Sequence, residues 1–391
     1  MRVPTAPTAA SRTRRGAVLR KLLISAAALL VFAVLLEIGA RIWLVRFAPD
    51  DVFFDYASVG QLETSNRPPP GGMGHPYMGY APVPGLVRGA DRTNSLGFRG
   101  DEIAQPKPAS EFRIVCLGGS TTFTTCEKDY TLSYPAQLER WLRAQASDRI
   151  RVVNAGVAGF GSWETLVNFE FRVLDLDPDL VIVYHGVNDI LPRLVWPPEA
   201  YRGDNTGFRA APRHLIWPSL AEHSTVLRML LVRTGRVLPH SQLDRNFFAH
   251  ADTYRGLRPH PDLPPVAPEQ MLDANPPIYF ERNLENLAVM ARHRGIVPVF
   301  VSFAHTTRFE DDPLPQYRVF FARAYPEMNA ALKDAADQGG AVFMDLAKDF
   351  PEDVELWCDA VHLNADGARL KAERIGAFLL EQQLVPPREG G

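Results

Sequence analysis

The sequence predicts an α/β fold in which a parallel β-sheet is covered by helices on both faces. Five short apolar segments have the β-branched composition and flanking turn residues of buried strands. They are residues 112–115, 151–154, 180–185, 296–302 and 341–345. Amphipathic helical patterns are found at residues 133–146, 162–174, 280–294, 318–338 and 365–383. Because the strands are continuously apolar and alternate with helices, we expect both faces of the sheet to be covered.

The composition is that of a folded globular protein. The 391 residues suffice for one large domain or two ordinary ones, and 46% of them are hydrophobic and 22% charged. The formal net charge of −3 gives the chain no basic excess. We therefore expect no nucleic-acid partner.

The first 45 residues predict a membrane anchor. Five basic residues precede an uncharged apolar run from Leu22 to Leu36; they are Arg12, Arg14, Arg15, Arg20 and Lys21. The apolar pattern continues to Val45 past Glu37 and Arg41, which lie four residues apart on one helical face, and so reaches the roughly 20 residues of a membrane helix. No Ala-x-Ala-like cleavage site follows closely, which favours an uncleaved anchor over a cleaved signal peptide or a buried soluble helix. Because basic flanks stay in the cytoplasm, we expect the chain after residue 46 to be extracytoplasmic.

Changes in composition divide the chain into five consecutive segments. They are a cytoplasmic basic tail (1–21), a transmembrane anchor (22–45), a linker and N-terminal extension that packs on the main domain (46–111), the α/β domain (112–385) and a C-terminal tail (386–391). Within the α/β domain, residues 191–277 contain thirteen prolines and one plausible helix, near residues 220–236. A stretch this long is an insertion, and such insertions usually act as lids or walls of a site.

Polar residues follow several predicted strands at their carboxyl ends, where open parallel sheets bind ligands. The first strand leads into Gly118-Gly-Ser120, the second into Asn154-Ala-Gly-Val-Ala-Gly159 and the third into Gly186-Val-Asn188-Asp189. After the last strand, Asp359-Ala-Val-His362 precedes the closing helix. Taken alone, Ser120 fits a helix N-cap, a phosphate cradle that lacks the Walker A lysine, or a nucleophile on a strand-to-helix turn.

These four segments, in this order and at these strand ends, resemble the blocks of the SGNH (GDSL-type) hydrolase superfamily over about residues 112–383. The first block reads Gly-Gly-Ser-Thr in place of Gly-Asp-Ser-Leu, so Gly119 and Thr121 depart from the pattern. The resemblance implies a flavodoxin-like three-layer fold with a parallel five-stranded sheet. It also implies a serine nucleophile that cleaves ester bonds.

The chemistry of the side chains agrees with a Ser-His-Asp triad. A serine hydroxyl needs a base within hydrogen-bond reach, and the imidazole of His362 is the candidate base. Asp359, three residues earlier, can accept the other ring N–H and hold the tautomer. The resemblance assigns the oxyanion hole to the backbone N–H groups of Ser120 and Gly159 and to the side-chain amide of Asn188.

Other interpretations of the neighbouring residues stay open. Gly156 and Gly161 compete with Gly159 for the same role, and Asn188 followed by Asp189 is also ordinary turn chemistry. His185 is expected to be a buried core or supporting residue, and Asp189 to hold the turn together. The other histidines and the tryptophans show no metal-ligand spacing, so we expect neither a metal nor another cofactor.

The three cysteines lie close to these segments. Cys116 falls in the first strand and is expected to be buried as a small apolar residue. Cys126 follows the nucleophile by six residues, and Cys358 precedes Asp359. An oxidising extracytoplasmic compartment would permit a disulfide between Cys126 and Cys358.

The sequence thus predicts a membrane-anchored extracytoplasmic serine esterase. Four aromatic residues of the insertion suit the faces of sugar rings; they are Trp196, Tyr201, Trp217 and Tyr254. We therefore expect short O-acyl esters, acetyl first, carried on a glycan or glycolipid. One alternative is an O-acyltransferase that uses the same triad, and another is a non-catalytic glycan-binding envelope protein.

Overall fold

The computed structural model describes most of the chain, in two compact units. The described residues are 9–65, 72–75, 77–205, 220–237, 254–255, 266–309 and 315–388. One unit falls within residues 1–70 and 213–245, and the other within 71–212 and 246–391. Parts of the predicted N-terminal tail, of the insertion and of the C-terminal tail lie outside the described residues, as does Trp217.

The second unit contains the predicted parallel sheet. Its strands are β5 (Phe112–Gly118), β6 (Ile150–Asn154), β7 (Leu180–Tyr184), β10 (Val297–Val301) and β11 (Val342–Met344). They are all parallel and lie in the order β11-β10-β7-β5-β6. The predicted five-stranded fold class is confirmed. The direction in which strands are added reverses at β5 and β7, and the crevice outside the carboxyl ends of such a pair is where this topology binds ligands.

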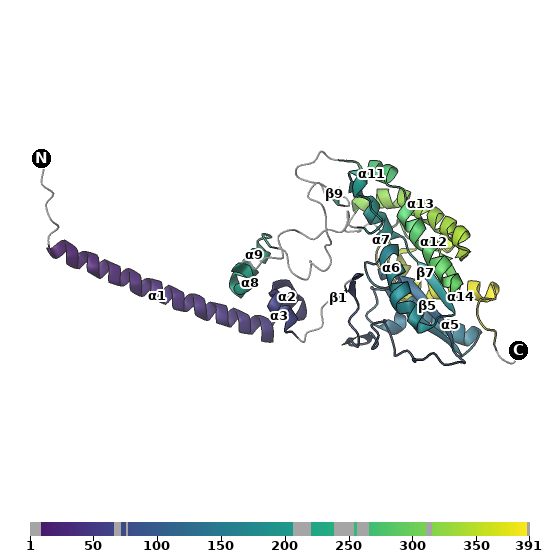
Figure 1. Cartoon of the computed structure of the whole chain (residues 1–391), viewed down its shortest axis with the longest axis horizontal. Coiled ribbons are helices and arrows are strands. Elements are labelled where there is room, and N and C mark those ends of the chain that lie inside the picture. Colours follow the sequence, from purple (N-terminus) through teal and green to yellow (C-terminus); the bar gives the residue numbers. More distant parts are fainter. Residues whose placement is uncertain are drawn as a thin grey trace. The chain divides into compact units, whose positions relative to one another are not determined.

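Helices cover both faces of the sheet, as Figure 1 shows. The helices α5 (Tyr134–Gln145) and α14 (Ala365–Glu381) pack against each other on one face. On the other face lie α6 (Ser162–Asn168), α12 (Ile278–His293) and α13 (Pro315–Gly339). The helix predicted over 162–174 is regular only to Asn168, because its hydrogen bonding widens over Phe169–Val173 and then tightens over Leu174–Leu176.

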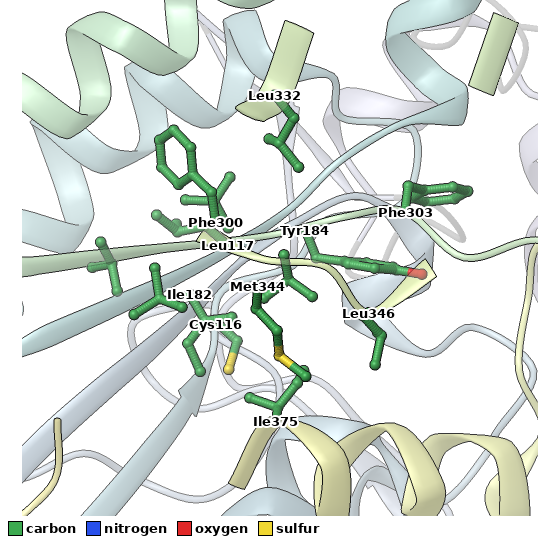
Figure 2. Packing of buried hydrophobic residues seen from close by; sticks show 14 of the residues in the cluster. Cys116, Leu117, Ile182, Tyr184, Phe300, Phe303, Leu332, Met344, Leu346 and Ile375 are labelled. Carbon is green, nitrogen blue, oxygen red and sulfur yellow. The ribbon is translucent and has the colours of Figure 1, made fainter. Parts of the chain in front are cut away.

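The core of this unit lies on both sides of the sheet. Every residue of β7 is buried, as are six of the seven residues of β5, which explains why these strands are continuously apolar. Figure 2 shows Leu332 of α13 beside Phe300 on one side, and Ile375 of α14 beside Met344 on the other. Cys116 is fully buried, as predicted, and burial raises the pKa of its thiol to about 12.

The N-terminal extension forms two small antiparallel pairs within the same unit. They are β1 (Met73–His75) with β2 (Gly79–Ala81), and β3 (Val87–Arg88) with β4 (Asp91–Arg92). Arg99 attaches the extension to the main sheet, because its backbone bridges to Asn154 at the end of β6. Its buried guanidinium pairs with Asp91 at 2.8 Å and donates to the backbone carbonyls of Phe123, Thr124 and Glu127.

The described part of the insertion consists of short elements. Within the second unit they are η4 (Leu191–Arg193), η5 (Pro198–Ala200), α11 (Pro268–Ala274), and β8 (Val195–Trp196) paired with β9 (Tyr254–Arg255). The helix predicted near 220–236 is divided into α8 (Leu220–His223) and α9 (Thr225–Arg233), which belong to the first unit. The division occurs at Ser224, whose side chain caps α9 by accepting from the backbone N–H of Leu227.

The first unit is built on one long helix, α1 (Ala9–Arg46), followed by α2 (Asp50–Tyr56) and α3 (Val59–Glu63). The end of α1 packs on α2 through a small apolar cluster that includes Leu44, Phe53 and Phe54. Glu37 pairs with Arg41 at 2.6 Å, as their spacing predicted. The same carboxylate accepts hydrogen bonds from the side chain of Ser224 and from the backbone N–H groups of Thr225 and Val226, so it caps the first turn of α9.

Part of α1 is long and apolar enough to cross a membrane. The stretch Arg20–Arg46 has 27 residues, its most apolar 18-residue window has a mean hydropathy of 2.5, and none of that window is buried in the protein. A cleaved signal sequence near the N-terminus would have the same properties.

Candidate active site

Ser120 lies at the first position of α4 (Ser120–Phe123), a single helical turn that follows β5 after Gly119. The two preceding glycines are required by close contacts. A Cβ on Gly118 would lie 2.5 Å from the carbonyl oxygen of Tyr184, and one on Gly119 would lie 2.5 Å from Nδ2 of Asn188. The strand therefore ends in glycines because its neighbours approach the backbone directly.

The three residues predicted to form a triad are in hydrogen-bond contact. Nε2 of His362 lies 2.7 Å from Oγ of Ser120, and Nδ1 of His362 lies 2.7 Å from Oδ2 of Asp359. The other carboxylate oxygen of Asp359 accepts from the backbone N–H groups of Val361 and His362, each at 2.8 Å. This turn holds the carboxylate beneath the imidazole ring, which remains 21% exposed and open to a substrate.

The environment of Asp359 favours its charged form. Burial raises the pKa of this carboxyl, but the hydrogen bonds from the His362 ring and from two backbone N–H groups outweigh it, and the pKa lies below its usual value. A carboxylate that stays ionised keeps a proton on Nδ1 of His362. Nε2 is then free to accept the proton of Ser120.

The residues predicted to form an oxyanion hole surround the same turn. Nδ2 of Asn188 donates to the carbonyl oxygen of Phe160 at 2.8 Å, which leaves its second N–H available. Gly159 has a φ of +84°, in the left-handed region that glycine tolerates best. Within the described part of the chain, the backbone N–H groups of Ser120 and Gly159 have no hydrogen-bond acceptor.

Cys126 and Cys358 form a disulfide, with their Cα atoms 6.5 Å apart. The bridge connects the loop after α4 to the loop that carries Asp359 and His362. It therefore joins the two chain segments that meet at the Ser120–His362 hydrogen bond.

Two residues whose roles the sequence left open are buried. His185 is 2% exposed, its Nε2 lies 2.8 Å from Oγ1 of Thr165, and burial lowers its pKa to about 3, so the ring is neutral. Asp189 accepts from the backbone N–H of Ser162 at 2.8 Å, and thus ties the turn after β7 to the start of α6. Both residues thus connect the end of β7 to α6.

The aromatic residues of the insertion are partly used in packing. Trp196 packs against the main core, and Tyr201 contacts the ring of Tyr279 edge-on at 4.8 Å. Among the described residues, no group of three or more His, Cys, Asp or Glu side chains is placed to hold a metal ion.

Sequence reasoning predicted that the N-terminal extension packs on the main domain, but it assigned none of the extension's residues to the site. Tyr80 donates a hydrogen bond from its hydroxyl to the carbonyl oxygen of Ala158, and Arg99 holds the loop after α4. Both residues lie in a segment rich in glycine, proline and aromatic residues, which carries no periodic pattern. No sequence signal would have separated them from their neighbours.

Comparison with known proteins identifies the family. The model of the GDSL-like Lipase/Acylhydrolase family matches residues 116–370, which is more than half of the chain and includes Ser120, Gly159, Asn188, Asp359 and His362. The chain belongs to the GDSL-like lipase/acylhydrolase family. It is therefore a hydrolase of ester bonds, as predicted.

Solved structures of GDSL-like hydrolases and esterases are similar to this chain at low sequence identity. An acetyl xylan esterase from Geobacillus stearothermophilus is 16% identical, with 70% of this chain and 96% of that chain covered and a TM-score of 0.39. A lipase/acylhydrolase from Enterococcus faecalis is 17% identical, with 69% and 96% covered and a TM-score of 0.39. No curated protein sequence matches the chain. The assignment to the GDSL-like family rests on the family model.

Asp189 gives this GDSL-like domain a pH-dependent stability. Burial raises the pKa of Asp189 to about 6, although hydrogen bonds from Ser162 oppose the rise, and its Oδ2 lies 3.6 Å from Nδ1 of His185 without a hydrogen bond. Because the pKa in the folded state exceeds the unfolded value, the contribution of this group to stability is fully present below about pH 4. It is lost as the pH rises through about 6.

We expect Asp189→Asn to raise the free energy of unfolding by about 1–3 kcal/mol at pH 7.5, because a neutral amide avoids the buried charge. Its Oδ1 can still accept from Ser162, and its amide can donate to Nδ1 of His185. Denaturant titrations at pH 7.5 and pH 5.0 measure the difference. A gain of the same size at both pH values would contradict this account, since the wild-type carboxyl is mostly protonated at pH 5.0.

Proposed function

We propose that this protein is a membrane-anchored, extracytoplasmic serine esterase that hydrolyses short O-acyl esters through Ser120, His362 and Asp359. The observation that carries the proposal is the continuous hydrogen-bond chain from Oγ of Ser120 through the imidazole of His362 to Asp359, with both distances at 2.7 Å. This is the arrangement in which a serine hydroxyl becomes a nucleophile.

In the first half of the reaction, Oγ of Ser120 attacks the ester carbonyl while Nε2 of His362 takes the hydroxyl proton. The carbonyl oxygen becomes an oxyanion, which receives hydrogen bonds from the backbone N–H groups of Ser120 and Gly159 and from Nδ2 of Asn188. The C–O bond to the alcohol then breaks, and His362 gives its proton to the departing oxygen. The product is an acyl ester of Ser120.

In the second half, a water molecule replaces the alcohol. His362 takes a proton from the water as its oxygen attacks the acyl carbonyl, and the same three donors stabilise the second oxyanion. When the bond to Ser120 breaks, the proton returns to Oγ and the carboxylic acid leaves. An acyltransferase would differ only here, with a sugar hydroxyl in place of water.

A short acyl group agrees with the crowded backbone around Ser120. Gly119, Phe160 and Asn188 approach one another so closely that a single Cβ at position 119 would collide with the other two. Trp196 and Tyr201, which were expected to contact the sugar carrier, take part in packing. Acetyl esters of sugars are therefore tested beside simple esters.

A panel of p-nitrophenyl esters from acetyl to decanoyl, together with acetylated sugars, tests the proposal on the full chain in detergent. We expect the highest kcat/KM with the acetyl ester. Activity that increases steadily with acyl length, with none on acetylated sugars, would replace the proposal with a lipase-like function. Transfer of the acetyl group to an added sugar, in preference to water, would favour the acyltransferase.

The orientation proposed for the anchor places the basic N-terminus in the cytoplasm and the esterase outside. The basic residues before the apolar stretch of α1 support this direction. Digestion of intact spheroplasts by an added protease measures it. Protection of the esterase domain in intact spheroplasts, with digestion after lysis, would reverse the orientation.

A further inference from the structure

The N-terminal extension reaches the loop that carries Gly159. The hydroxyl of Tyr80, on β2, donates a hydrogen bond to the carbonyl oxygen of Ala158. The Tyr80 ring contacts Phe160 edge-on, with the ring centroids 5.3 Å apart. The Tyr80 hydroxyl also occupies the space that a Cβ on Gly159 would need. Tyr80 thus contacts three consecutive residues of this loop.

The hydrogen bond to Ala158 determines where the N–H of Gly159 points. The carbonyl of Ala158 and the N–H of Gly159 belong to one trans peptide group, in which the two bonds point in opposite directions. A donor that holds the carbonyl on one side therefore holds the N–H on the other. The peptide is the central one of a β-turn that is closed by a hydrogen bond from the Phe160 N–H to the Val157 carbonyl at 3.0 Å. The turn holds its two ends but allows its central peptide either orientation, and both residues of that peptide are exposed, so the Tyr80 hydroxyl selects the orientation.

A second contact keeps the extension in position. The guanidinium of Arg99 donates to the carbonyls of Phe123, Thr124 and Glu127, which follow the turn that carries Ser120. The extension therefore contacts both the segment after the nucleophile and the loop of the oxyanion hole. The buried side chain of Arg99 holds the extension in place, and Tyr80 is the residue of the extension that contacts the loop of Gly159.

We propose that Tyr80 is a positioning residue that orients the Ala158–Gly159 peptide, so that the N–H of Gly159 points into the oxyanion hole. The inference rests on the proposed serine esterase function. It adds that catalysis by this hydrolase depends on Tyr80, which lies outside the residues 116–370 that the family model matches. The hydroxyl acts through Gly159 and does not touch the reacting atoms.

Tyr80→Phe removes the hydroxyl and keeps the ring contact with Phe160. We expect kcat for p-nitrophenyl acetate to decrease about 10-fold, with KM within about twofold of the wild type, because the lost orientation affects the transition state and not the bound ester. Affinity for a phenylboronic acid, which forms a tetrahedral adduct with a serine, should fall by a similar factor. The melting temperature should stay the same, since water can replace this exposed hydrogen bond.

Tyr77→Phe is the matched control, because this tyrosine lies in the same segment, is 68% exposed and stacks on Phe171. It should behave as the wild type. An unchanged kcat in Tyr80→Phe would overturn the inference. A loss confined to KM would also overturn it and assign Tyr80 to substrate binding.

The failure of the inference can be separated from failure of the proposed function. If the wild type hydrolyses no ester in the panel and a fluorophosphonate does not label Ser120, the proposed function fails. If the wild type is active and Tyr80→Phe matches it in both kcat and boronic-acid affinity, only the role of Tyr80 fails.

Discussion

Replacement of Ser120 by alanine is expected to lower kcat for ester hydrolysis by roughly 10⁴–10⁶-fold, because the variant has no oxygen with which to form the acyl intermediate. The fold should be unaffected, since within the described residues the Ser120 side chain makes a single hydrogen bond, to His362. Steady-state kinetics on p-nitrophenyl acetate and a thermal melt measure the two effects. His362→Ala should lose nearly as much, and the double variant little more, because the members of a triad act as a unit.

Thr125→Ala is a suitable control for Ser120→Ala. Thr125 follows the same helical turn, and its hydroxyl makes no hydrogen bond within the described part of the chain. Its activity should match the wild type. Turnover by Ser120→Ala at a rate close to that of the control would exclude the serine mechanism.

The second large effect is expected at Gly119, because the space that a side chain would need there is already occupied by Asn188 and Phe160. Gly119→Asp restores the residue of the Gly-Asp-Ser-Leu pattern, yet we expect it to lower kcat by roughly 10²–10³, the usual cost of one oxyanion donor. A Cβ at this position would lie 2.5 Å from Nδ2 of Asn188 and 2.9 Å from the backbone carbonyl oxygen of Phe160. The amide of Asn188 would therefore have to leave its place.

A double-variant cycle with Asn188→Ala tests this explanation. If Gly119→Asp acts by displacing Asn188, the double variant should be about as active as Asn188→Ala alone, because the same donor is lost only once. Additive losses would show that the aspartate harms the site by another route. Wild-type activity in Gly119→Asp would mean that the backbone near Phe160 moves to make room.

The strands and helices of the sheet could be predicted because their signals are local. Continuous apolar segments such as Leu180–Tyr184 correspond to β7, and the closing helix begins directly after Asn364, whose side chain caps it. The division of the predicted helix at Ser224 combines a local signal, the Ser224 cap on Leu227, with hydrogen bonds to Glu37, which is distant in the sequence. Local patterns carry no information about such a partner.

The candidate site was predictable only in part. The blocks around Ser120, Asn188 and His362 have a recognisable order, and the structure brings these residues together, while their catalytic roles remain predictions. The contacts of Tyr80 and Arg99 depend on how the extension packs, which composition does not determine. Glycine is likewise required at position 119 because Phe160 and Asn188, which are distant in the sequence, lie against its backbone. The turn alone would not require it.

In the proposed topology, the position of Glu37 on α1 has a consequence for helix α9. The uncharged run from Leu22 to Leu36 covers about 22 Å of helix axis, at about 1.5 Å per residue, which is less than the roughly 30 Å of hydrocarbon in a typical membrane. A span of about 30 Å that begins at Leu22 takes about 20 residues and ends near Arg41. Glu37 therefore lies in the outer part of the hydrocarbon layer, and Arg41 lies at its outer edge. Their mutual pairing, and the capping of α9 by Glu37, lower the cost of placing them there. The capped helix α9 is thereby held at the lipid headgroups, and this part of the insertion cannot move away from the membrane without uncovering a charge.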